Sequence, residues 1–532
     1  MKTTLIKVQK AQVSLPNSSL LFEDVSFDIS SGEVVALVGA NGAGKSTLFR
    51  LIMKQQEYDS GQISINGRLG YMPQSLSSPE ITVRSLLADT SGETLAKIAK
   101  DMWQTEELLK QDENNTKIAQ DYANFISEWY NLGGIDIEEI WDICCQEVLN
   151  ESFEKVALRK LTTLSGGQAK RLAISALLLG SFDILMLDEP DNFLDVQGKR
   201  WLELELKKAK QGILLISHDR ALLSSVADKI VTIEAQTGWI HHSKYDTYEM
   251  ARIERLEQLL EYNKRIVKER NRLEDDLNQL KRWAASSKSR KKQAIAVEKR
   301  LKRFEENNTE QRITRNETVQ FRLSSETSGK KVITFQHLSI MGLIKPFTAE
   351  VRLGDRIAII GRNGVGKSHL IRLLAGDQSI NHTGTFTLGT RVKIGYFNQL
   401  HDRPNFWGKT PVEILTYNEI PMQQSMPLLA RYGLAARYNV KFEYLSGGQQ
   451  ARLQLAIIES SGSNLLLLDE PTDNLDIISA GELEHSLNNF QGTVICVSHD
   501  RWLLENSFDS YWNLNDDGQI EILSELPQTY YC

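Results

Sequence analysis

The sequence Gly39-Ala-Asn-Gly-Ala-Gly44-Lys45-Ser46 decides the fold of this chain, and it directly follows the apolar run at residues 34–38. A continuous apolar run that ends in a glycine-rich turn is typical of a buried parallel strand leading into a helix. Glycines let backbone N–H groups approach a phosphate, and the positive N-terminal end of the helix attracts its charge. The lysine suits the β and γ phosphates, and the serine hydroxyl suits Mg²⁺. The stretch therefore predicts an α/β nucleotide-binding domain.

The chain contains this motif twice, because Gly361-Arg-Asn-Gly-Val-Gly366-Lys367-Ser368 follows a second apolar run at residues 356–360. Three further motifs recur in the same order, namely Leu-Ser-Gly-Gly-Gln at 164–168 and 445–449, Asp-Glu-Pro at 188–190 and 469–471, and Ser-His-Asp-Arg at 217–220 and 498–501. The serine of the first of these precedes the aspartate of the next by 23 residues in both copies. Four ordered motifs at matched spacing predict two copies of one domain.

The two copies differ in length only in the middle of each copy, upstream of the Leu-Ser-Gly-Gly-Gln motif. Gln74 precedes Ser165 by 91 residues, whereas Gln399 precedes Ser446 by 47, so the first copy holds about 44 extra residues. We expect this insertion within residues 88–140. It is acidic, since residues 89–147 hold fourteen acids, four lysines and no arginine. The predicted domains are a first cassette at 1–240, a helical linker at 241–325 and a second cassette at 326–532.

Residues 245–310, between the two copies, have the pattern of a helical hairpin. Apolar residues recur there at a seven-residue spacing, the seam of a coiled coil, at Leu259, Ile266, Leu273 and Leu280, with companions at Leu256 and Leu277. The run 284–287 interrupts this seam, and spacings of three and four resume at Ala294, Val297, Leu301 and Phe304. We therefore expect two antiparallel helices.

The tip of this hairpin is strongly basic. Residues 281–303 hold ten lysines or arginines and one acid, Glu298, in a chain whose net charge is −7. A charge run is often only a solvated face, but this one lies at the end of a projecting element. A polyanion is therefore the expected partner. The cations that we expect to contact RNA are Lys281, Arg282, Lys288, Arg290, Lys291, Lys292, Lys299 and Arg300.

Composition excludes several classes of protein. The 532 residues hold no run of 18 apolar residues, so no membrane span is expected, and the first 16 residues lack the apolar core of a secretory signal. The four cysteines show neither metal-ligand spacing nor a disulfide framework, at Cys144, Cys145, Cys496 and Cys532. We expect a cytoplasmic protein.

The motifs resemble those of the ATP-binding-cassette superfamily, and their arrangement resembles its ABC-F branch. That branch joins two cassettes through a charged helical linker, without transmembrane segments, and the resemblance covers nearly the whole chain. It implies an α/β fold with two P-loop ATP-binding-cassette domains joined by an antiparallel α-helical coiled-coil hairpin. It also implies an ATP hydrolase that uses ATP and Mg²⁺ and works as a monomer whose cassettes pair with each other.

Each copy has an apolar run that ends in Asp-Glu. Neighbouring strand residues point to opposite sides, so the aspartate can hold Mg²⁺ while the glutamate deprotonates water. By the resemblance, a switch histidine contacts the γ phosphate and a glutamine binds metal and water. The implied catalytic residues are Glu189, Glu470, His218 and His499. The implied metal ligands are Ser46, Gln74, Asp188, Ser368, Gln399 and Asp469.

The Leu-Ser-Gly-Gly-Gln motif by itself predicts only a capped helix start. In the family it completes the ATP site of the opposite cassette. The implied composite sites join Lys45, Asp188 and Glu189 to Ser446 and Gly448, and Lys367, Asp469 and Glu470 to Ser165 and Gly167. The implied ATP-binding residues are Gly39, Asn41, Gly42, Gly44, Lys45, Ser46, Thr47, Gln74, Ser165, Gly167, Gln168, Gly361, Asn363, Gly364, Gly366, Lys367, Ser368, His369, Gln399, Ser446, Gly448 and Gln449.

After the Asp-Glu pair, the first copy has Asp191, Asn192 and Phe193 where Thr, Asn and His are common in the family. The second copy has Asp473 at the usual Asn position, and His369 replaces the usual Thr. None of these changes removes a catalytic group. They do leave open whether the two sites hydrolyse ATP at equal rates. No aromatic residue stands at the usual adenine-stacking place in either copy.

The resemblance implies the ribosome as partner, with the hairpin tip directed from the tRNA exit site toward P-site tRNA and the peptidyl-transferase region. A basic tip can bind folded RNA through sequence-independent contacts with its phosphates, which agrees with the ribosome as partner. The acidic insertion resembles an arm found in some family members, and its charge predicts a basic ribosomal protein as its contact. The alternative for the insertion is a solvated helical pair packed through Trp103, Trp129 and Trp141.

Other functions remain as alternatives. A transporter ATP-binding subunit would need membrane partners and has no use for a hairpin between cassettes. A DNA-acting ATPase is the stronger rival, although the DNA-binding relatives carry a C-terminal coiled extension that this sequence lacks after His499. Two functions are consistent with the ribosome interpretation, a housekeeping translation factor and antibiotic resistance by ribosomal protection. We favour the translation factor, although the sequence alone does not separate the two.

Overall fold

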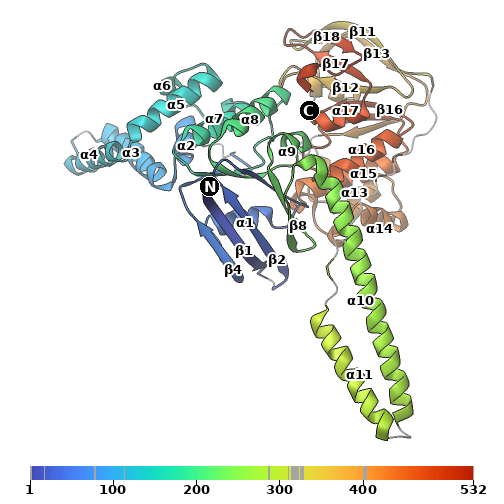
Figure 1. Cartoon of the computed structure of the whole chain (residues 1–532). Coiled ribbons are helices and arrows are strands. Elements are labelled where there is room, and N and C mark those ends of the chain that lie inside the picture. The colour runs from blue at the N-terminus through green and yellow to red at the C-terminus, as the bar shows by residue number, and fades with distance from the viewer. Residues whose placement is uncertain are drawn as a thin grey trace.

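The computed structural model of the protein describes residues 3–16, 18–76, 80–112, 114–284, 288–308, 311–312, 321, 323, 329–398 and 404–530. Two α/β bodies lie side by side, and a long helical hairpin projects from them (Figure 1). The predicted fold class, two P-loop cassettes with a helical hairpin between them, is confirmed.

The first cassette is built on a nine-stranded sheet. Its strands follow one another in space as β4 (Ser60–Ile65), β1 (Thr4–Ser14), β2 (Leu20–Ser30), β9 (Thr237–His241), β8 (Lys229–Glu234), β3 (Val34–Gly39), β7 (Gly212–Ile216), β6 (Ile184–Asp188) and β5 (Leu69–Met72). The strands from β5 to β8 are parallel, so their carboxyl ends meet at one edge. This edge collects the phosphate-binding loop after β3, the Asp-Glu pair at the end of β6 and the switch histidine after β7.

The second cassette repeats this core in two sheets. The smaller sheet orders β11 (Ile344–Arg352), β10 (Lys331–Ile340) and β13 (His382–Leu388). The larger orders β14 (Ile394–Phe397), β15 (Leu465–Asp469), β16 (Thr493–Val497), β12 (Arg356–Ile360), β17 (Ser510–Leu514) and β18 (Ile520–Leu523). The parallel order β14-β15-β16-β12-β17 matches β5-β6-β7-β3-β8, as the repeated motifs predict.

Corresponding helices follow the functional motifs in both cassettes. In the first they are α1 (Lys45–Ile52), α7 (Gly166–Leu179), α8 (Val196–Lys208) and α9 (Arg220–Val226). In the second they are α12 (Lys367–Leu374), α15 (Gly447–Ser460), α16 (Ile477–Asn489) and α17 (Arg501–Ser507).

The cassettes differ most between the glutamine and signature motifs. The first has α2 (Val83–Asp89), α3 (Glu93–Gln111), α4 (Thr116–Asn131), α5 (Gly134–Leu149) and α6 (Phe153–Val156). The second has only α13 (Pro411–Tyr417) and α14 (Met422–Arg431) among its described residues. Helices α3 and α4 fall within the expected insertion and project sideways as a pair, which we call the arm (Figure 1).

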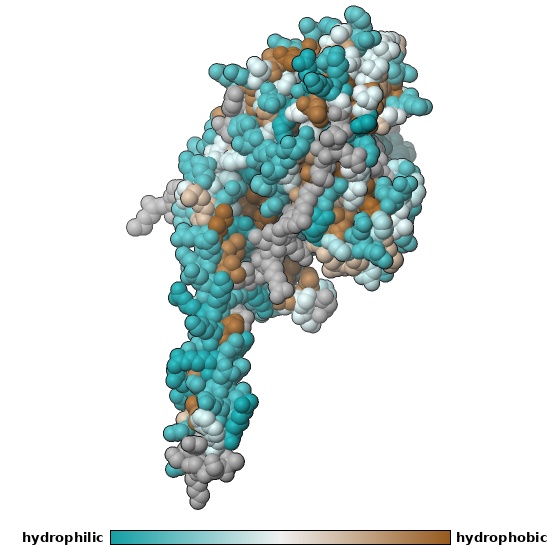
Figure 2. Space-filling view, turned by 90° about the vertical axis from the view of Figure 1, so that its right-hand side faces the viewer, coloured by the Kyte–Doolittle hydropathy of each residue, from teal (hydrophilic) through white to brown (hydrophobic). Residues whose placement is uncertain are grey.

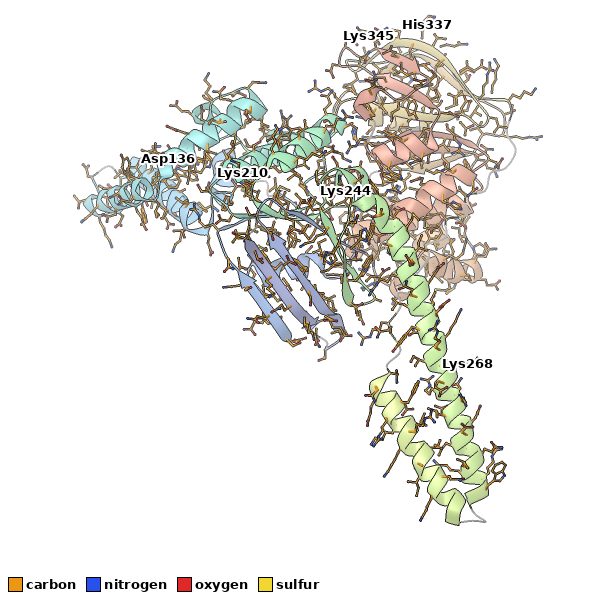
Figure 3. The ribbon with its side chains drawn as sticks, in the orientation of Figure 1. Asp136, Lys210, Lys244, Lys268, His337 and Lys345 are labelled. Atoms are coloured by element: carbon orange, nitrogen blue, oxygen red, sulfur yellow. The ribbon has the colours of Figure 1, made fainter. Side chains whose placement is uncertain are left out.

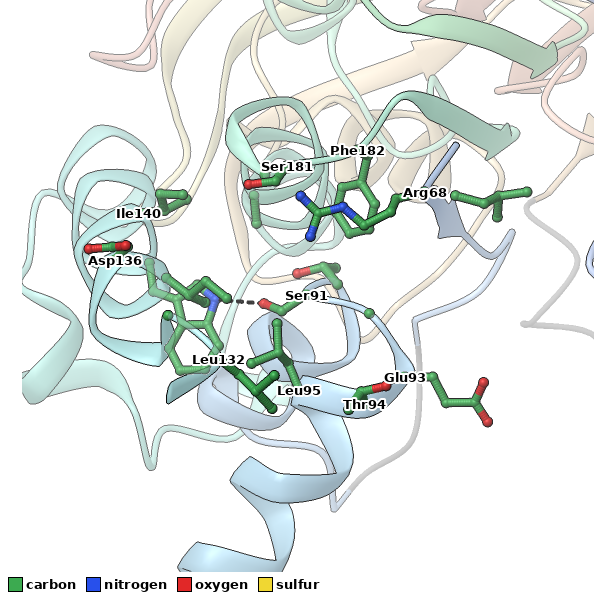
Figure 4. Close-up of a pocket in the computed structure, with 18 residues that line it drawn as sticks. Arg68, Ser91, Glu93, Thr94, Leu95, Leu132, Asp136, Ile140, Ser181 and Phe182 are labelled. Carbon is green, nitrogen blue, oxygen red and sulfur yellow. Dashed lines mark hydrogen bonds between the residues drawn. The ribbon is translucent and has the colours of Figure 1, made fainter. Parts of the chain in front are cut away.

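Tryptophans attach the arm to the cassette. The ring of Trp141 lies 5.8 Å from that of Trp129 and 6.3 Å from that of Trp103. Trp141 is only 1% exposed, and its indole N–H donates to the hydroxyl of Ser91 at 3.1 Å. Figure 4 shows this bond beside a cavity of about 600 Å³ at the base of the arm. The arm therefore has an apolar anchor, and its two helices together hold six acids and four lysines.

We expect Trp141→Ala to lower the free energy of unfolding of the first cassette by about 3–5 kcal/mol, because it removes a large buried ring and its partners cannot fully close the gap. Urea unfolding followed by circular dichroism measures this. Tyr130→Ala, at an arm position that is 68% exposed, is the control and should change it by less than about 0.5 kcal/mol. Equal effects of the two changes would contradict the anchoring role.

The hairpin consists of α10 (Tyr248–Ala284) and α11 (Lys288–Asn307). The predicted seam is where the helices meet, since Ile266, Leu273, Leu277 and Ala294 are buried. Lys281 on α10 lies 3.0 Å from Glu298 on α11. The face of the hairpin that is visible in Figure 2 is mostly hydrophilic. Figure 3 labels Lys268, which lies on α10. A helix of 37 residues is about 55 Å long, which makes α10 a stiff lever.

The base of α10 is fixed to the first cassette. Tyr248 stacks on Trp239 of β9 at 5.6 Å, and its hydroxyl lies 3.0 Å from that of Thr232 in β8. Arg252 forms an ion pair with Glu234. The hairpin must therefore follow any movement of the first cassette. None of the helices in the described part of the chain is long and apolar enough to cross a membrane.

Candidate active site

The first cassette and the second together enclose a cavity of about 490 Å³. The first contributes the phosphate-binding loop and the ends of β6 and β7, with Asn41, Gly42, Gly44, Lys45, Ser46, Thr47, Gln74, Asp188, Glu189 and His218. The second contributes its signature motif and the segment after its Asp-Glu pair, with Ser446, Gly447, Gly448, Asp473 and Asn474. The residues expected to form the first composite site thus line one space.

A second cavity of about 380 Å³ repeats this arrangement with the cassettes exchanged. The second cassette contributes Asn363, Gly364, Gly366, Lys367, Ser368, His369, Glu470, Asp473, Val497 and His499. The first contributes Ser165, Gly166, Gly167, Asp191, Asn192, Phe193, Leu194 and Lys199. Asp469 belongs to this site through the hydroxyl of Ser368, which donates to its carboxylate at 3.0 Å.

Reciprocal polar contacts hold the cassettes together. Arg220 donates to Glu484 across the interface at 2.8 Å, and Arg501 makes the matching ion pair with Glu203. The side-chain amides of the loop asparagines also cross it, from Asn41 to the carbonyl of Asn474 at 3.4 Å and from Asn363 to that of Phe193 at 3.2 Å.

One glycine of the signature motif permits this close approach. A Cβ on Gly448 would lie 2.8 Å from the amide nitrogen of Asn41 in the opposite cassette and 2.8 Å from the carbonyl oxygen of Asn474. A side chain there would therefore have to displace the Asn41 amide of the opposite cassette and the Asn474 backbone of its own.

The two lysines of the phosphate-binding loops are buried and turned onto their own loops. Lys45 donates to the carbonyl of Gly39 at 2.7 Å, and Lys367 donates to that of Gly361 at 2.8 Å. Burial lowers the pKa of Lys45, although Glu189 opposes this shift. Gly44 has φ +102°, a conformation that favours glycine and turns the backbone N–H groups of the loop inward.

Each site pairs a serine hydroxyl with a strand-end aspartate. Ser46 donates to Asp188 at 3.3 Å, as Ser368 does to Asp469. Burial raises the pKa of Asp188, and the hydrogen bond from Ser46 opposes that shift. Oxygen donors of this kind suit Mg²⁺, which prefers few protein ligands together with phosphates and water. These residues fit the expected metal.

The glutamates that follow these aspartates have left-handed backbones, with φ +50° at Glu189 and +48° at Glu470. Such a conformation is uncommon for a residue other than glycine and concentrates at functional sites. The Glu189 carboxylate accepts from the amides of Gln74 and Asn192, each at 2.6 Å. The Glu470 carboxylate accepts from the backbone N–H of His499 at 3.0 Å. Both carboxylates are thereby held toward the cavities.

The two switch histidines differ in their partners. Nε2 of His499 donates to Oδ1 of Asn363 at 2.9 Å. Both ring nitrogens of His218 are shielded from solvent and lack a hydrogen-bond partner among the described residues. Burial lowers the pKa of His218 to about 3, so the ring is neutral and has one N–H to donate. The shielded ring of His218 lies in the same cavity as Lys45, so a phosphate oxygen bound there could accept the hydrogen bond of its N–H.

Several predicted site residues lie apart from the cavities. Gln168 and Gln449 accept from the backbone N–H groups of Ser165 and Ser446 in capping boxes that start α7 and α15. Gly39 and Gly361 pack against the next strand, since a Cβ there would meet the carbonyls of β8 and β17 residues. Gln399 lies outside the described residues. The first cavity is also bordered by the aliphatic Leu15 and Leu21.

The glutamate environments also differ, because Asp473 occupies the position that Asn192 has in the first cassette. Burial and the nearby charge of Asp473 raise the pKa of Glu470 to about 8. Whereas Asn192 supplies an amide donor to Glu189, an ionised Asp473 can only repel the carboxylate beside it. The second site is therefore less well arranged for proton transfer.

We expect Asp473→Asn to increase ATP turnover at the second site about three- to tenfold, because it removes this repulsion and adds an amide donor. Phosphate release in a Glu189→Gln background isolates the second site. The reverse change, Asn192→Asp in a Glu470→Gln background, should slow the first site by a similar factor. Turnover that is unchanged in both would argue against this difference.

Sequence reasoning missed the residues that connect the cassettes. Glu203 and Glu484 lie on exposed-looking helical patterns, and nothing local marks them as partners of Arg220 and Arg501. The arginines themselves recur in the Ser-His-Asp-Arg motifs, and this repetition was the available signal. Lys199 has no counterpart in the second copy, so the repeat could not identify it.

Comparisons with known proteins agree with this geometry. The family described as ABC transporter matches residues 22–192 and 344–473. A protein named antibiotic resistance protein in Mycobacteroides abscessus is 37% identical over 95% of this chain and 96% of its own length. The energy-dependent translational throttle protein EttA of Escherichia coli strain K12 is 31% identical over 95% of this chain and 91% of its own.

Solved structures agree in fold. The structure titled as ribosome-bound archaeal Pelota and ABCE1 contains a chain that aligns with a TM-score of 0.57 at 18% identity. The alignment covers 97% of this chain and 78% of that one. At this identity the likeness concerns the paired cassettes alone.

Proposed function

The chain belongs to the ABC-F family of ATPases with two ATP-binding cassettes, and we propose that it uses the closing and opening of these cassettes to act on the ribosome. The observation that carries this proposal is a stiff basic hairpin attached to a pair of cassettes that share two cavities, each lined by residues of both cassettes. ATP is the proposed substrate at both sites, and Mg²⁺ would be held by Ser46 with Asp188 and by Ser368 with Asp469.

Hydrolysis follows from the positions of the protein groups. Lys45 and the loop N–H groups orient the phosphates in the first site, and Ser46 with Asp188 would hold the Mg²⁺ that would neutralise phosphate charge. Glu189 takes the proton from the attacking water, while Gln74 and Asn192 hold its carboxylate in place. The neutral ring of His218 donates to the phosphate that is transferred. In the second site Lys367, Glu470 and His499 take these roles.

ATP links the cassettes because each site is made by both. The phosphates on one cassette bind the serine and glycine N–H groups at the start of the signature helix of the other. Loss of the terminal phosphate weakens this bridge, and the cassettes can separate. Because α10 is fixed to the first cassette through Tyr248 and Arg252, separation moves the hairpin.

The hairpin tip is the proposed RNA-contacting surface. Arg282, Lys292 and Lys299 are exposed, and Arg300 is 72% exposed in its side chain. The side chains of Lys288, Arg290 and Lys291 lie outside the described residues. The proposed target is reached from the tRNA exit site and comprises P-site tRNA and the peptidyl-transferase region. The resulting activity is regulation of translation or relief of stalled ribosomes, in the cytoplasm and by a monomer.

Antibiotic resistance by ribosomal protection is the second candidate function. It is favoured by the relative from Mycobacteroides abscessus, which is 37% identical and is named an antibiotic resistance protein. Susceptibility to ribosome-targeting drugs, with and without the gene, separates the two candidates. Unchanged susceptibility to every such drug would reject the resistance function and favour the translation factor.

The acidic insertion at residues 89–147 is proposed to contact a basic ribosomal protein, because its acidic surface should avoid RNA. We expect a photo-cross-linking residue at Tyr130, on α4, to capture such a protein in an ATP-dependent manner. The same probe at Met341 in the second cassette, which is 65% exposed, is the control site. Adducts from Tyr130 to ribosomal RNA alone would defeat this contact.

Direct binding tests the choice of partner. The protein with ATP should be retained by purified ribosomes and not by duplex DNA at the same salt concentration, since both partners are polyanions and salt weakens each. Retention on DNA alone would favour the DNA-acting ATPase. If the protein bound neither ribosomes nor DNA, its ATPase activity would remain but its partner would be unassigned. The transporter ATP-binding subunit would then be the remaining alternative.

A further inference from the structure

A buried lysine lies between the segments that carry the two switch histidines. Lys199 on α8 is 8% exposed. Its ammonium group lies 2.9 Å from Oδ2 of Asp219, the residue that follows His218 in the first cassette. It also donates to the carbonyl oxygen of His499 in the second cassette at 3.2 Å. One cation therefore contacts both switch segments across the interface.

The acids around Lys199 keep it charged. Burial alone would lower the pKa of Lys199, but Asp219 and Asp191 outweigh this effect and raise it. Asp219 is also 3.9 Å from the guanidinium of Arg501, and these cations hold its pKa low despite burial. Burial raises the pKa of Asp473, on the other side of the interface, to about 6. Lys199 and Arg501 are thus the cations of a shielded cluster contributed by both cassettes.

This bridge has no counterpart on the other side of the pseudo-symmetric pair. Helices α8 and α16 both start at a capping aspartate, Asp195 and Asp476. The fourth residue after the cap is Lys199 in α8 and Ala480 in α16. Lys199 lines the second cavity, whereas Ala480 does not line the first. The lysine therefore serves the second site from the first cassette.

We propose that Lys199 couples the two ATP sites, by positioning the switch segment of the second site according to the position of the switch segment of the first. This inference rests on the proposed ATPase function of both sites. Lys199 acts through the backbone of His499, so it is a positioning residue. Its partner Asp219 is tied to the first site, because it caps α9 by accepting from the N–H of Leu222 at 2.9 Å.

The coupling has a direction. When the first site is filled, His218 is held by phosphate, and Asp219 next to it keeps Lys199 against the carbonyl of His499. When the first site releases its phosphate, Asp219 is free to shift, and the support of His499 weakens. Hydrolysis at the second site is therefore fastest while the first remains occupied. At the matching position of α16, Ala480 has no ammonium group, so this lysine contact does not exist in the opposite direction.

Single-site turnover tests this. The full-length variants Glu189→Gln and Glu470→Gln leave only the second and only the first site active, and each is combined with Lys199→Ala. We expect Lys199→Ala to lower kcat at the second site about tenfold, with little change in KM, because the switch histidine is displaced from its reacting position. Turnover at the first site should change less than about twofold. Lys208→Ala, at an exposed position of the same helix, should affect neither site.

A double-mutant cycle separates coupling from a structural role. Asp219→Asn keeps the helix cap, since asparagine caps equally well, but it weakens the contact with Lys199. It should also slow the second site, and its effect should not add to that of Lys199→Ala. Lys199→Arg should retain most of the turnover. Lys199→Met, which fills the same space without charge, replaces the alanine variant if that fails to fold.

One outcome would reject the coupling by Lys199, and another would reject the assignment of the ATP sites. Equal losses at both sites, or additive effects of Lys199→Ala and Asp219→Asn, would reject the coupling and leave the ATPase in place. If neither Glu189→Gln nor Glu470→Gln alone lowered turnover, the assignment of the ATP sites would fail whatever Lys199 does.

Discussion

The double variant Glu189→Gln, Glu470→Gln is expected to hydrolyse ATP about 10²- to 10⁴-fold more slowly than the unchanged protein, because a positioned general base contributes that much to proton transfer. Each glutamate follows the aspartate that ends a strand, and each has a left-handed backbone and lines its cavity. Glutamine keeps the shape and still accepts the hydrogen bonds of Gln74 and Asn192, so ATP binding should persist.

Phosphate release and binding of a fluorescent ATP analogue, measured on the same sample, test both parts of this expectation. The matched control is Glu57→Gln, Glu525→Gln, which changes one exposed glutamate in each cassette and should leave turnover unaltered. A double variant that hydrolyses ATP at the normal rate would remove both glutamates from the mechanism. Loss of binding would show instead that the substitution disturbs the site.

Neutralising the hairpin tip should weaken ribosome binding at least about 100-fold at physiological salt, because phosphate contacts supply most of the affinity for folded RNA. The change is Lys or Arg to Gln at Lys281, Arg282, Lys292, Lys299 and Arg300. Each lost phosphate contact should also reduce the slope of log affinity against log salt by about one. The ATPase activity without ribosomes should remain, because the tip lies at the end of the hairpin that points away from the two cassettes (Figure 1).

The control for the tip must remove the same charge elsewhere. Five exposed lysines on the cassettes provide it, changed to Gln together, at Lys7, Lys207, Lys210, Lys244 and Lys345. This variant should bind ribosomes within about threefold of the unchanged protein if the tip carries the contact. Equal losses in both variants would indicate non-specific attraction by net charge.

Much of the fold was predictable because its determinants are local. The residues at 34–46 dictate strand, turn and helix by apolar continuity and glycine, and their recurrence at 356–368 predicted the second cassette. The seven-residue spacing from Leu259 to Leu280 predicted the hairpin, and its central members are buried against α11. Patterns of this kind are set by near neighbours in the chain.

The contacts between cassettes were not predictable in the same way. Lys199 and His499 are 300 residues apart, and no periodicity links them. Gln168 and Gln449 belong to a motif that reads as functional, yet their side chains cap the signature helices. The left-handed backbone of Glu189 depends on tertiary packing, as does the His218 ring, which has no hydrogen-bond partner in the described part of the chain. A motif does not encode such packing.

The most direct test of the account is co-sedimentation of the Glu189→Gln, Glu470→Gln variant with ribosomes, with and without ATP. The variant should close on ATP without hydrolysing it, so it should pellet with ribosomes only when ATP is present, and the tip substitutions should abolish that pelleting. Failure to pellet with ATP, or equal pelleting without it, would contradict an ATP-gated ribosome factor.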